Sequence, residues 1–405
     1  MKQDLVTVLD LGSTKVACLV ASQGPTGGIE IHATAVADCK GIRRGVVADL
    51  DETTRAIDLV LRKVENQLGE QIESVVVGVT GSHIEGVNAQ GYVPIYPRTR
   101  SVTREDVMQV INHSRQLVLP PDREQIQAIP REFKVDGQRG IQHPIGMSAG
   151  RLECTTYLIT GQTTQLQNIE RAVSMAGRKV DHMVLQSLAS GLAVLTDEER
   201  ELGAAVVDIG GGTTDLAIFS NGSIAYSASI PVGGQLVSSD VSKLLKTSPD
   251  EAERLKVEQG AASSKMAAER ESVEVWQLGQ TDARPLQRRV LCEIIESRMR
   301  EVAVMVRQQI DRGGFAGMLP GGVALTGGGA MLRGVDRLFE ELIPHARFRV
   351  AEPYVPKMDA SGHGFATAIG MAKFMIEAGD DELVAAGGAT AWKDKIKSIW
   401  SILKP

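Results

Sequence analysis

The chain has 405 residues, of which 43% are hydrophobic and 23% are charged, a composition typical of a globular protein with room for two or more domains. Its net charge of -6 argues against nucleic acid as a main partner, since nucleic-acid-binding domains carry a basic face. Four isolated cysteines, seven histidines without a metal-binding pattern and the lack of an apolar window of about 18 residues predict no zinc site, disulfide framework or membrane-spanning helix.

The first segment with a clear pattern, residues 6–20, reads VTVLDLGSTKVACLV, which predicts an apolar strand, a polar turn and a second apolar strand. Because residues 1–4, MKQD, run straight into this strand, we expect no signal peptide. Glycine in the turn lets the backbone approach a ligand, so that successive N–H groups can point at an anion. The turn and its flanks carry Asp10, Gly12, Ser13, Thr14 and Lys15.

The first half of the chain continues with strands and one helix. Residues 29–37 read as a third strand, Asp51 opens a helix that runs to about residue 67, and residues 73–79 form a buried strand. The next block, residues 83–158, has short strands, several prolines and one helix over residues 104–117, but no phosphate-type turn. We interpret this block as an inserted subdomain, with a second lobe of the core as the alternative.

The pattern of the first segment returns in the middle of the chain. A helix over residues 163–176, a strand over 179–185 and a helix over 186–195 precede residues 206–219, which read VVDIGGGTTDLAIF. Two hairpins of the form Asp-apolar-Gly, one near the start and one near the middle, indicate an internal duplication. The second turn carries Asp208, Gly210, Gly211, Gly212 and Thr213.

The remaining elements surround a third glycine-rich turn, LTGGGA, which contains Gly327, Gly328 and Gly329 and follows an apolar strand from Val323. Ser248 before Pro249 has the chemistry of a helix N-cap. The other predicted elements are a strand over residues 227–231, a helix over 235–245 after the turn Gly233-Gly234, a helix to Lys256, a strand over 272–278, a helix over 288–313, a helix over 331–342, a strand over 347–351 and a helix over 362–378.

The ordered set DLGSTK, DIGGGTTD and LTGGGA resembles the two phosphate motifs and the adenosine motif of the actin-like ATPases. Within that superfamily, IPREF at residues 129–133, PIGMS at 144–148, LTDEERELG at 195–203 and IPVGG at 230–234 closely resemble the FtsA family of bacterial cell-division proteins. The resemblance covers nearly the whole chain. It implies an α/β fold of two duplicated, ribonuclease H-like lobes with the inserted subdomain that this family calls 1C.

The same resemblance implies a division of the chain into named parts. The two lobes are completed by segments that return late in the sequence, and a tail follows the last helix. The implied parts are subdomain 1A (residues 1–82, completed by 361–378), subdomain 1C (83–158), subdomain 2A (159–234, completed by 314–360), subdomain 2B (235–313), a flexible linker (379–391) and an amphipathic membrane-targeting helix (392–405).

The glycine-rich turns suit a nucleotide. Phosphate needs backbone N–H donors and a positive charge, and the magnesium ion that accompanies ATP prefers hard oxygen ligands. The two turns would supply donors from both sides of a cleft, and Lys15 would neutralise phosphate charge. Asp10 and Asp208 would hold Mg²⁺ through water, with ordinary turn aspartates as the alternative. The predicted cofactors are therefore ATP or ADP, and Mg²⁺.

Further roles come from the resemblance to the actin-like ATPases. It implies that the glycines at 327–329 pack against the α-phosphate and adenosine, while Glu253 and Lys256 reach the ribose and base. We also expect Thr213, Gly233 and Gly234 in the cofactor site. Gln186 falls where relatives orient the attacking water, with a polar residue at a helix start as the alternative. Binding is thus predicted, while hydrolysis stays open.

The tail, residues 392–405, has the pattern of an amphipathic helix. Five large apolar residues fall on one face, namely Trp392, Ile396, Ile399, Trp400 and Leu403. Four lysines against one aspartate make the tail basic. A helix of about 13 residues is roughly 20 Å long, which suits the surface of an anionic membrane; packing on the protein's own core is the alternative. Because one such helix is a reversible anchor, stable attachment favours polymerisation.

The FtsA resemblance also implies protein partners. In that family subdomain 2B binds the C-terminal peptide of the tubulin-like FtsZ through basic residues on its last long helix, where this chain has Arg288, Arg289, Arg298 and Arg300. A solvated helix face is the alternative for each arginine. The leading hypothesis is an ATP-binding, self-assembling adaptor on the inner face of the cytoplasmic membrane at the division site, which tethers the FtsZ ring and helps recruit later division proteins through 1C.

An enzyme on the same fold, a sugar or acetate kinase or a phosphatase, is the competing class. Such an enzyme has no need of the tail, and it would carry a substrate pocket in its insertions, where we find no cluster of acid and base residues. A chaperone ATPase would need a long β-rich peptide-binding domain after the core, and we expect none here, so the sequence does not favour this class.

Overall fold

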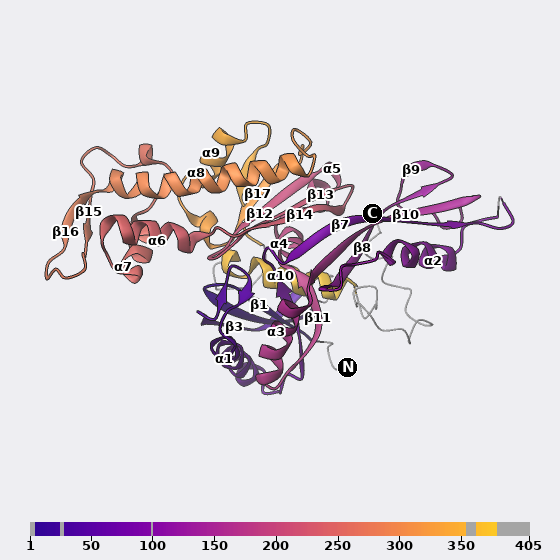
Figure 1. Cartoon of the computed structure of the whole chain (residues 1–405), viewed down its shortest axis with the longest axis horizontal. Coiled ribbons are helices and arrows are strands. Elements are labelled where there is room, and N and C mark those ends of the chain that lie inside the picture. Colours follow the sequence, from indigo (N-terminus) through magenta and orange to yellow (C-terminus); the bar gives the residue numbers. More distant parts are fainter. Residues whose placement is uncertain (1–4, 25–27, 99, 354–361, 379–405) are drawn as a thin grey trace.

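The computed structural model describes residues 5–24, 28–98, 100–353 and 362–378. Two five-stranded sheets form the centres of two lobes, and a four-stranded sheet forms a separate subdomain (Figure 1). The predicted linker and membrane-targeting helix, residues 379–405, lie outside the described residues. Within the described part of the chain, no helix is both long enough and apolar enough to cross a bilayer.

The first lobe has a sheet with the strand order β11-β6-β1-β2-β3. β1, β2 and β3 are antiparallel, and β6 and β11 extend the sheet in parallel. Successive strand side chains point to opposite faces, so that α1 and α3 cover one face and α4 and α10 the other. The bounds are β1 (Val6–Leu11), β2 (Lys15–Gln23), β3 (Ile29–Asp38), β6 (Ser74–Val79), β11 (Lys179–Leu185), α1 (Leu50–Leu68), α3 (Thr163–Met175), α4 (Gln186–Val194) and α10 (Ala366–Ala378).

The second lobe repeats this topology in the order β14-β13-β12-β17-β18, again three antiparallel strands followed by two parallel ones. The predicted internal duplication is therefore confirmed. Helices α6, α8 and α9 cover one face of this sheet. The bounds are β12 (Ala204–Ile209), β13 (Thr214–Ser220), β14 (Ser223–Ile230), β17 (Val323–Thr326), β18 (Phe348–Val350), α6 (Gly234–Leu245), α8 (Arg288–Arg312) and α9 (Val335–Leu342).

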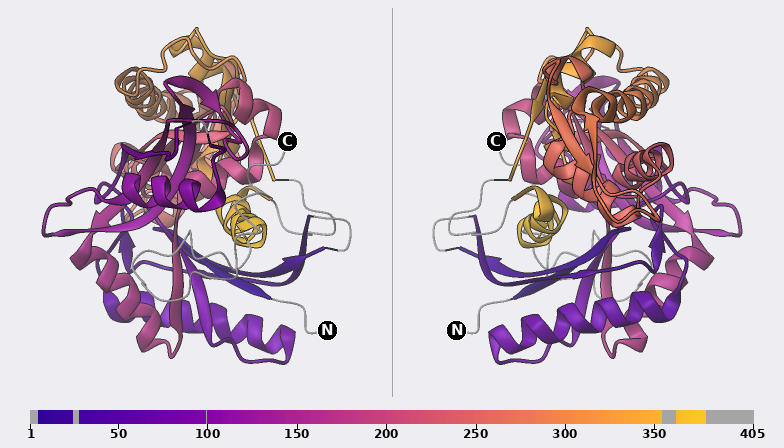
Figure 2. Two further views of the ribbon diagram at one scale, coloured as in Figure 1. Left: turned by 90° about the vertical axis from the view of Figure 1, so that its right-hand side faces the viewer. Right: turned by 90° about the vertical axis from the view of Figure 1, so that its left-hand side faces the viewer.

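Helices α4 and α10 lie between the two lobes and cross closely. In Figure 2 the yellow helix α10 lies between the indigo sheet of the first lobe and the orange part of the second. A Cβ atom at Gly370 of α10 would overlap the carbonyl oxygen of Ala189 in α4, so glycine is needed at this crossing. Small residues such as Gly370 and Ala189 therefore allow the two backbones to meet where the lobes join.

The block predicted as an insert is a separate subdomain with the sheet order β7-β10-β8-β9 and helix α2 on one face. Its three main strands have 11, 12 and 13 residues, so the prediction of short strands is wrong. Pro130 lies inside β8 beside a shift of register at Thr155/Thr156, where the missing N–H is tolerated. The bounds are β7 (Ile84–Pro94), α2 (Arg104–Arg115), β8 (Arg123–Val135), β9 (Gln138–Ile141) and β10 (Arg151–Gln162).

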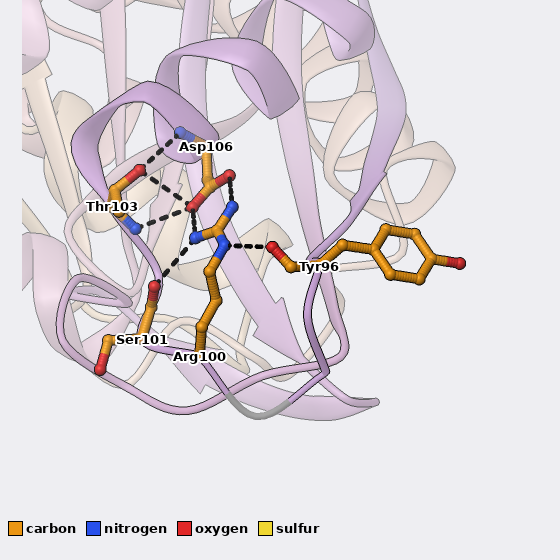
Figure 3. A network of polar contacts seen from close by, with 5 residues as sticks. All are labelled: Tyr96, Arg100, Ser101, Thr103 and Asp106. Carbon is orange, nitrogen blue, oxygen red and sulfur yellow. Dashed lines mark hydrogen bonds and ion pairs between the residues drawn. The ribbon is translucent and has the colours of Figure 1, made fainter.

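A polar network holds the outer loop of this insert against α2. Figure 3 shows the Arg100 guanidinium donating to both carboxylate oxygens of Asp106, at 2.6 and 2.7 Å, and to the carbonyl oxygens of Tyr96 and Ser101. Thr103 caps the start of α2, and its backbone N–H donates to the Asp106 carboxylate. The pair with Arg100 lowers the pKa of Asp106 to about 2, so the network stays charged across the physiological pH range.

Several boundaries differ from the sequence prediction. Helix α1 begins at Leu50 with Asp49 as its cap, not at Asp51. Strand β14 begins at Ser223, because Asn221 and Gly222 both have positive φ and close a two-residue hairpin after β13. The strand predicted over residues 272–278 ends at Val275. The remaining elements are β4 (Ile42–Arg43), β5 (Val46–Val47), α5 (Asp197–Leu202), α7 (Pro249–Gln259), β15 (Ser272–Val275), β16 (Arg284–Gln287) and three short 3-10 turns, η1 (Ser264–Met266), η2 (Gly328–Met331) and η3 (Gly362–Phe365).

Candidate functional site

A cleft of about 460 Å³ lies between the lobes and is lined by the three glycine-rich turns. The turn after β1 and the turn after β12 face each other, and the turn after β17 closes one side. Gln186 and every residue predicted for the cofactor line this cleft except Gly233. A Cβ atom at Gly233 would crowd the carbonyl oxygens of Gly210 and Gly211, so Gly233 packs behind the second turn instead.

The two hairpin turns have the same geometry and touch across the cleft. The N–H of Gly12 donates to Lys15 O at 3.0 Å, and the N–H of Gly210 donates to Thr213 O at 2.9 Å. Cβ atoms at Gly211 and Gly212 would overlap the side chains of the first turn, Thr14 and Ser13 respectively. Bare glycine backbone therefore lets two turns from duplicated lobes close around one volume.

Three carboxylates line the cleft, the buried Asp215 and the half-buried Asp10 and Asp208. Burial and the charge of Asp208 raise the pKa of Asp10 to about 7. Burial also raises the pKa of Asp208, although the hydroxyls of Ser190 and Thr367 donate to its carboxylate, at 2.6 and 3.2 Å. The pKa of Asp215 is raised to about 6, mainly by burial.

These carboxylates fit a hydrated magnesium ion. Their mutual repulsion is offset mainly by Lys15 and neutral hydroxyls, so a divalent cation would supply the missing charge. Among the described residues, no three His, Cys, Asp or Glu side chains are grouped tightly enough to enclose a metal by themselves. The donor set therefore suits Mg²⁺, which keeps most of its waters when carboxylates hold it.

Lys15 and Gln186 are both held in place at the cleft. The Lys15 ammonium donates to Gly364 O at 2.8 Å and lies 5.8 Å from the centre of the Phe365 ring. The Gln186 amide, at the first residue of α4, donates to Asp10 Oδ1 at 3.0 Å. The side chain predicted to orient water is thus fixed next to the carboxylate predicted to hold the metal.

Helix α7 contributes Glu253 and Lys256, one turn apart, on the side of the cleft formed by the third turn. Lys256 Nζ donates to Glu253 Oε2 at 2.8 Å and to Gly234 O at 3.2 Å. Val257 and Met299 line the same region. A charged pair next to an apolar wall suits a ligand with a polar ring of hydroxyls and a flat apolar base.

The four arginines predicted to bind a partner peptide are not equivalent. The Arg288 side chain is only 8% exposed; it pairs with Glu271 and donates to Gln259 O and Met266 O. Its donors are used inside the subdomain, which leaves little of the Arg288 side chain accessible to a partner. The others are more exposed but form ion pairs with the protein's own acids, Arg289 with Glu293, Arg298 with Asp240 and Glu301, and Arg300 with Glu296 and Glu341.

The sequence did not predict several residues that line the cleft, and Asp215 and Thr80 are the most informative of them. Asp215 accepts from Thr80 Oγ1 at 2.5 Å and from Thr213 Oγ1 at 2.8 Å. Asp215 is the second acid of the motif DIGGGTTD, a signal that could have identified it. Thr80 follows β6 with no recognisable motif, and its place in the cleft depends on how the two lobes meet.

The raised pKa of Asp10 predicts a pH dependence of stability. Between its unfolded pKa of 3.8 and its folded pKa of about 7, the folded carboxyl holds a proton that the unfolded chain has lost. The free energy of unfolding of the protein without ligand therefore falls by about 2–4 kcal/mol as pH rises through this window. Urea unfolding at pH 5 and 7.5 measures this loss, which Asp10→Asn should reduce. An equal loss in the variant would contradict the assignment.

Comparisons with known proteins agree with this geometry. The protein-family model described as "Cell division protein FtsA" matches residues 205–370, and the family model described as "SHS2 domain inserted in FTSA" matches residues 81–160. The chain is 34% identical over 353 residues to cell division protein FtsA of Pseudomonas aeruginosa, covering 87% of this chain and 84% of that protein.

Solved structures resemble the fold at lower identity. The PilM–PilN type IV pilus biogenesis complex has a TM-score of 0.63 at 15% identity, with 92% of this chain and 98% of that chain covered. MreB5 of Spiroplasma citri bound to ADP has a TM-score of 0.55 at 14% identity, with 91% and 95% covered. These likenesses confirm the predicted actin-like fold.

Proposed function

The chain belongs to the FtsA family of cell-division proteins, and from this premise we propose that it is an ATP-binding, polymerising adaptor that tethers the FtsZ ring to the cytoplasmic membrane. The observation that carries the nucleotide part is the cleft itself. Two matched turns meet there over one buried and two half-buried carboxylates, and Lys15 lies beside them. Backbone donors, one ammonium and carboxylates for Mg²⁺ are the groups that a nucleotide triphosphate requires.

Each group has a distinct place in the proposed complex. Ser13 and Thr14 from one lobe and the glycines at 210–212 from the other would bind the β- and γ-phosphates, with Lys15 neutralising charge. Asp10 and Asp208 would hold Mg²⁺ through water, and the glycines at 327–329 would contact the α-phosphate and adenosine. Glu253 and Lys256 would bind the ribose and base. Gln186 would orient the attacking water. Because its amide also donates to Asp10, it is only partly available for that role, and we expect ATP turnover to be slow.

Membrane attachment is proposed through residues 392–405, on sequence pattern alone. Their apolar face and four lysines suit an anionic lipid surface. Linked copies multiply the weak binding of each tail, so polymerisation and membrane attachment support each other. The place of action in this proposal is the inner face of the cytoplasmic membrane at the division site.

The FtsZ contact is proposed on subdomain 2B, through Arg289, Arg298 and Arg300. The acidic partners of these arginines are surface residues with side-chain exposures from 15% to 54%, and a carboxylate-bearing peptide could exchange with them. Later division proteins would bind the 1C insert.

One comparison separates this adaptor from the competing enzyme. Isothermal calorimetry with MgATP tests the cleft, and co-pelleting with FtsZ filaments and anionic vesicles tests the tether. A screen for phosphoryl transfer to sugars and acetate tests the kinase reading. ATP binding with co-pelleting and no transfer supports the adaptor, whereas transfer to a small substrate without co-pelleting would overturn it.

A further inference from the structure

The 1C insert is rooted in the first lobe. Strand β7 follows β6 after four residues, and β10 runs directly into α3. In the buried base of the insert, Gln127 Oε1 accepts from the N–H of Leu185 at the end of β11, at 2.9 Å. The Arg123 guanidinium donates to His83 O and to Thr160 O. The bond from Leu185 to Gln127 and the two direct chain connections therefore make the base of the insert continuous with the first lobe.

The same base also contacts the second lobe, through β14. The hydroxyl of Tyr157 on β10 lies 2.8 Å from the hydroxyl of Ser227 on β14. Asn88 on β7 donates to Ala225 O, and Ser223 donates to Pro130 O on β8, both at 3.4 Å. Figure 1 shows β7 and β8 passing beside β14. The insert therefore bridges the lobes on the side away from subdomain 2B.

The central contact of this bridge, Tyr157 with Ser227, is closely packed. Tyr157 is 1% exposed, and burial raises the pKa of its hydroxyl to about 12. A Cβ atom at Gly86 on the neighbouring strand would overlap this hydroxyl. The tyrosine therefore has little room to move when β14 moves, and displacement of the strand must be passed to β10.

Strand β14 also reaches the nucleotide cleft. Ser229 is paired in register with Asp215 of β13, and its hydroxyl lies 3.4 Å from the hydroxyl of Thr80 in the first lobe. Ser227 and Ser229 are two residues apart on one strand, so both side chains point to the same face. One face of β14 thus carries a contact with the cleft and a contact with the insert.

We propose that β14 couples the nucleotide cleft to the insert, so that the ligand in the cleft changes the conformation of the insert and its affinity for a partner. Thr80 and Tyr157 belong to the first lobe and the insert, whereas Asp215, Ser227 and Ser229 belong to the second lobe. Any movement of the lobes about a nucleotide must therefore change both contacts together. By linkage, a partner on the insert changes nucleotide affinity by the same factor. This coupling rests on the proposed nucleotide function.

The test uses the full chain and hydrogen–deuterium exchange of the insert, with and without saturating MgATP. In the wild type, MgATP should change amide exchange in β7 and β8. Tyr157→Phe and Ser227→Ala each remove the contact from one side. Both should keep ATP affinity within about 3-fold of wild type, while the response of the insert falls by about half or more. The matched control is Tyr226→Phe, whose lost hydroxyl donates to Gln309 within the second lobe.

The possible outcomes distinguish failure of the proposed function from failure of the coupling alone. If calorimetry detects no ATP binding, the proposed function and the coupling both fail. If ATP binds but does not change amide exchange in the insert, only the coupling fails. The same holds if MgATP changes exchange in Tyr157→Phe and Ser227→Ala as much as in the wild type. Loss of the response in both variants but not in Tyr226→Phe supports it. Should Tyr157→Phe unfold, Ser227→Ala decides, because it removes a single half-buried hydroxyl without altering the packed ring.

Discussion

Asp208→Asn is expected to weaken MgATP binding by about 10- to 100-fold, the usual loss when a group that orients a metal or its waters is removed. The half-buried carboxylate of Asp208 raises the pKa of Asp10 by its charge and accepts from Ser190 and Thr367. The amide keeps the shape of the side chain but not its charge, so the effect reports on the cation. Calorimetry with MgATP measures the change in affinity.

The same substitution should not destabilise the protein without ligand. Burial raises the pKa of Asp208, which means that its charged form is disfavoured in the fold, and neutral asparagine removes that penalty. An unfolding temperature equal to or above the wild-type value would therefore accompany the lost affinity, as expected for a functional residue. The matched control is Asp181→Asn, which likewise accepts from a serine hydroxyl, Ser74, but lies outside the cleft. Unchanged ATP affinity in Asp208→Asn would contradict the proposed site.

Trp400→Glu is expected to release the protein from anionic vesicles. Burial of a large apolar side chain contributes about 1.5–3 kcal/mol, and a new negative charge at an anionic surface adds about 1 kcal/mol of repulsion. Together these lower the affinity of one tail by roughly 100-fold. Because an assembled polymer multiplies the loss over many tails, co-sedimentation with vesicles should be abolished.

The control for this variant is Trp276→Glu, the same change at a tryptophan that is 51% exposed on subdomain 2B. It should leave co-sedimentation unchanged, and raised salt should weaken binding of the wild type as the lysines are screened. A Trp400→Glu protein that still sediments with vesicles would rule out the tail as the anchor. If it instead lost thermal stability in solution, the tail would belong to the protein's own core.

The turns around the cleft could be predicted because their chemistry is local. Close backbone approach to an anion requires glycine, and the strand-turn-strand pattern places Asp10 and Asp208 at equivalent positions of a duplicated unit. The insert could be located by its lack of that pattern, but the length of its strands could not, because proline is disfavoured in strands unless a bulge or edge accepts it, as at Pro130.

The sequence by itself determined the duplicated lobes, the cleft-lining turns and the family, because these depend on residues close together in the chain. Only the tertiary structure decided that Thr80 meets Asp215 across 135 positions, that Arg288 is used up inside subdomain 2B and that β14 contacts both the cleft and the insert. No spacing rule encodes such contacts, since each joins residues that meet only when elements far apart in the chain pack together. Burial and partners, rather than residue type, then set the role of each side chain.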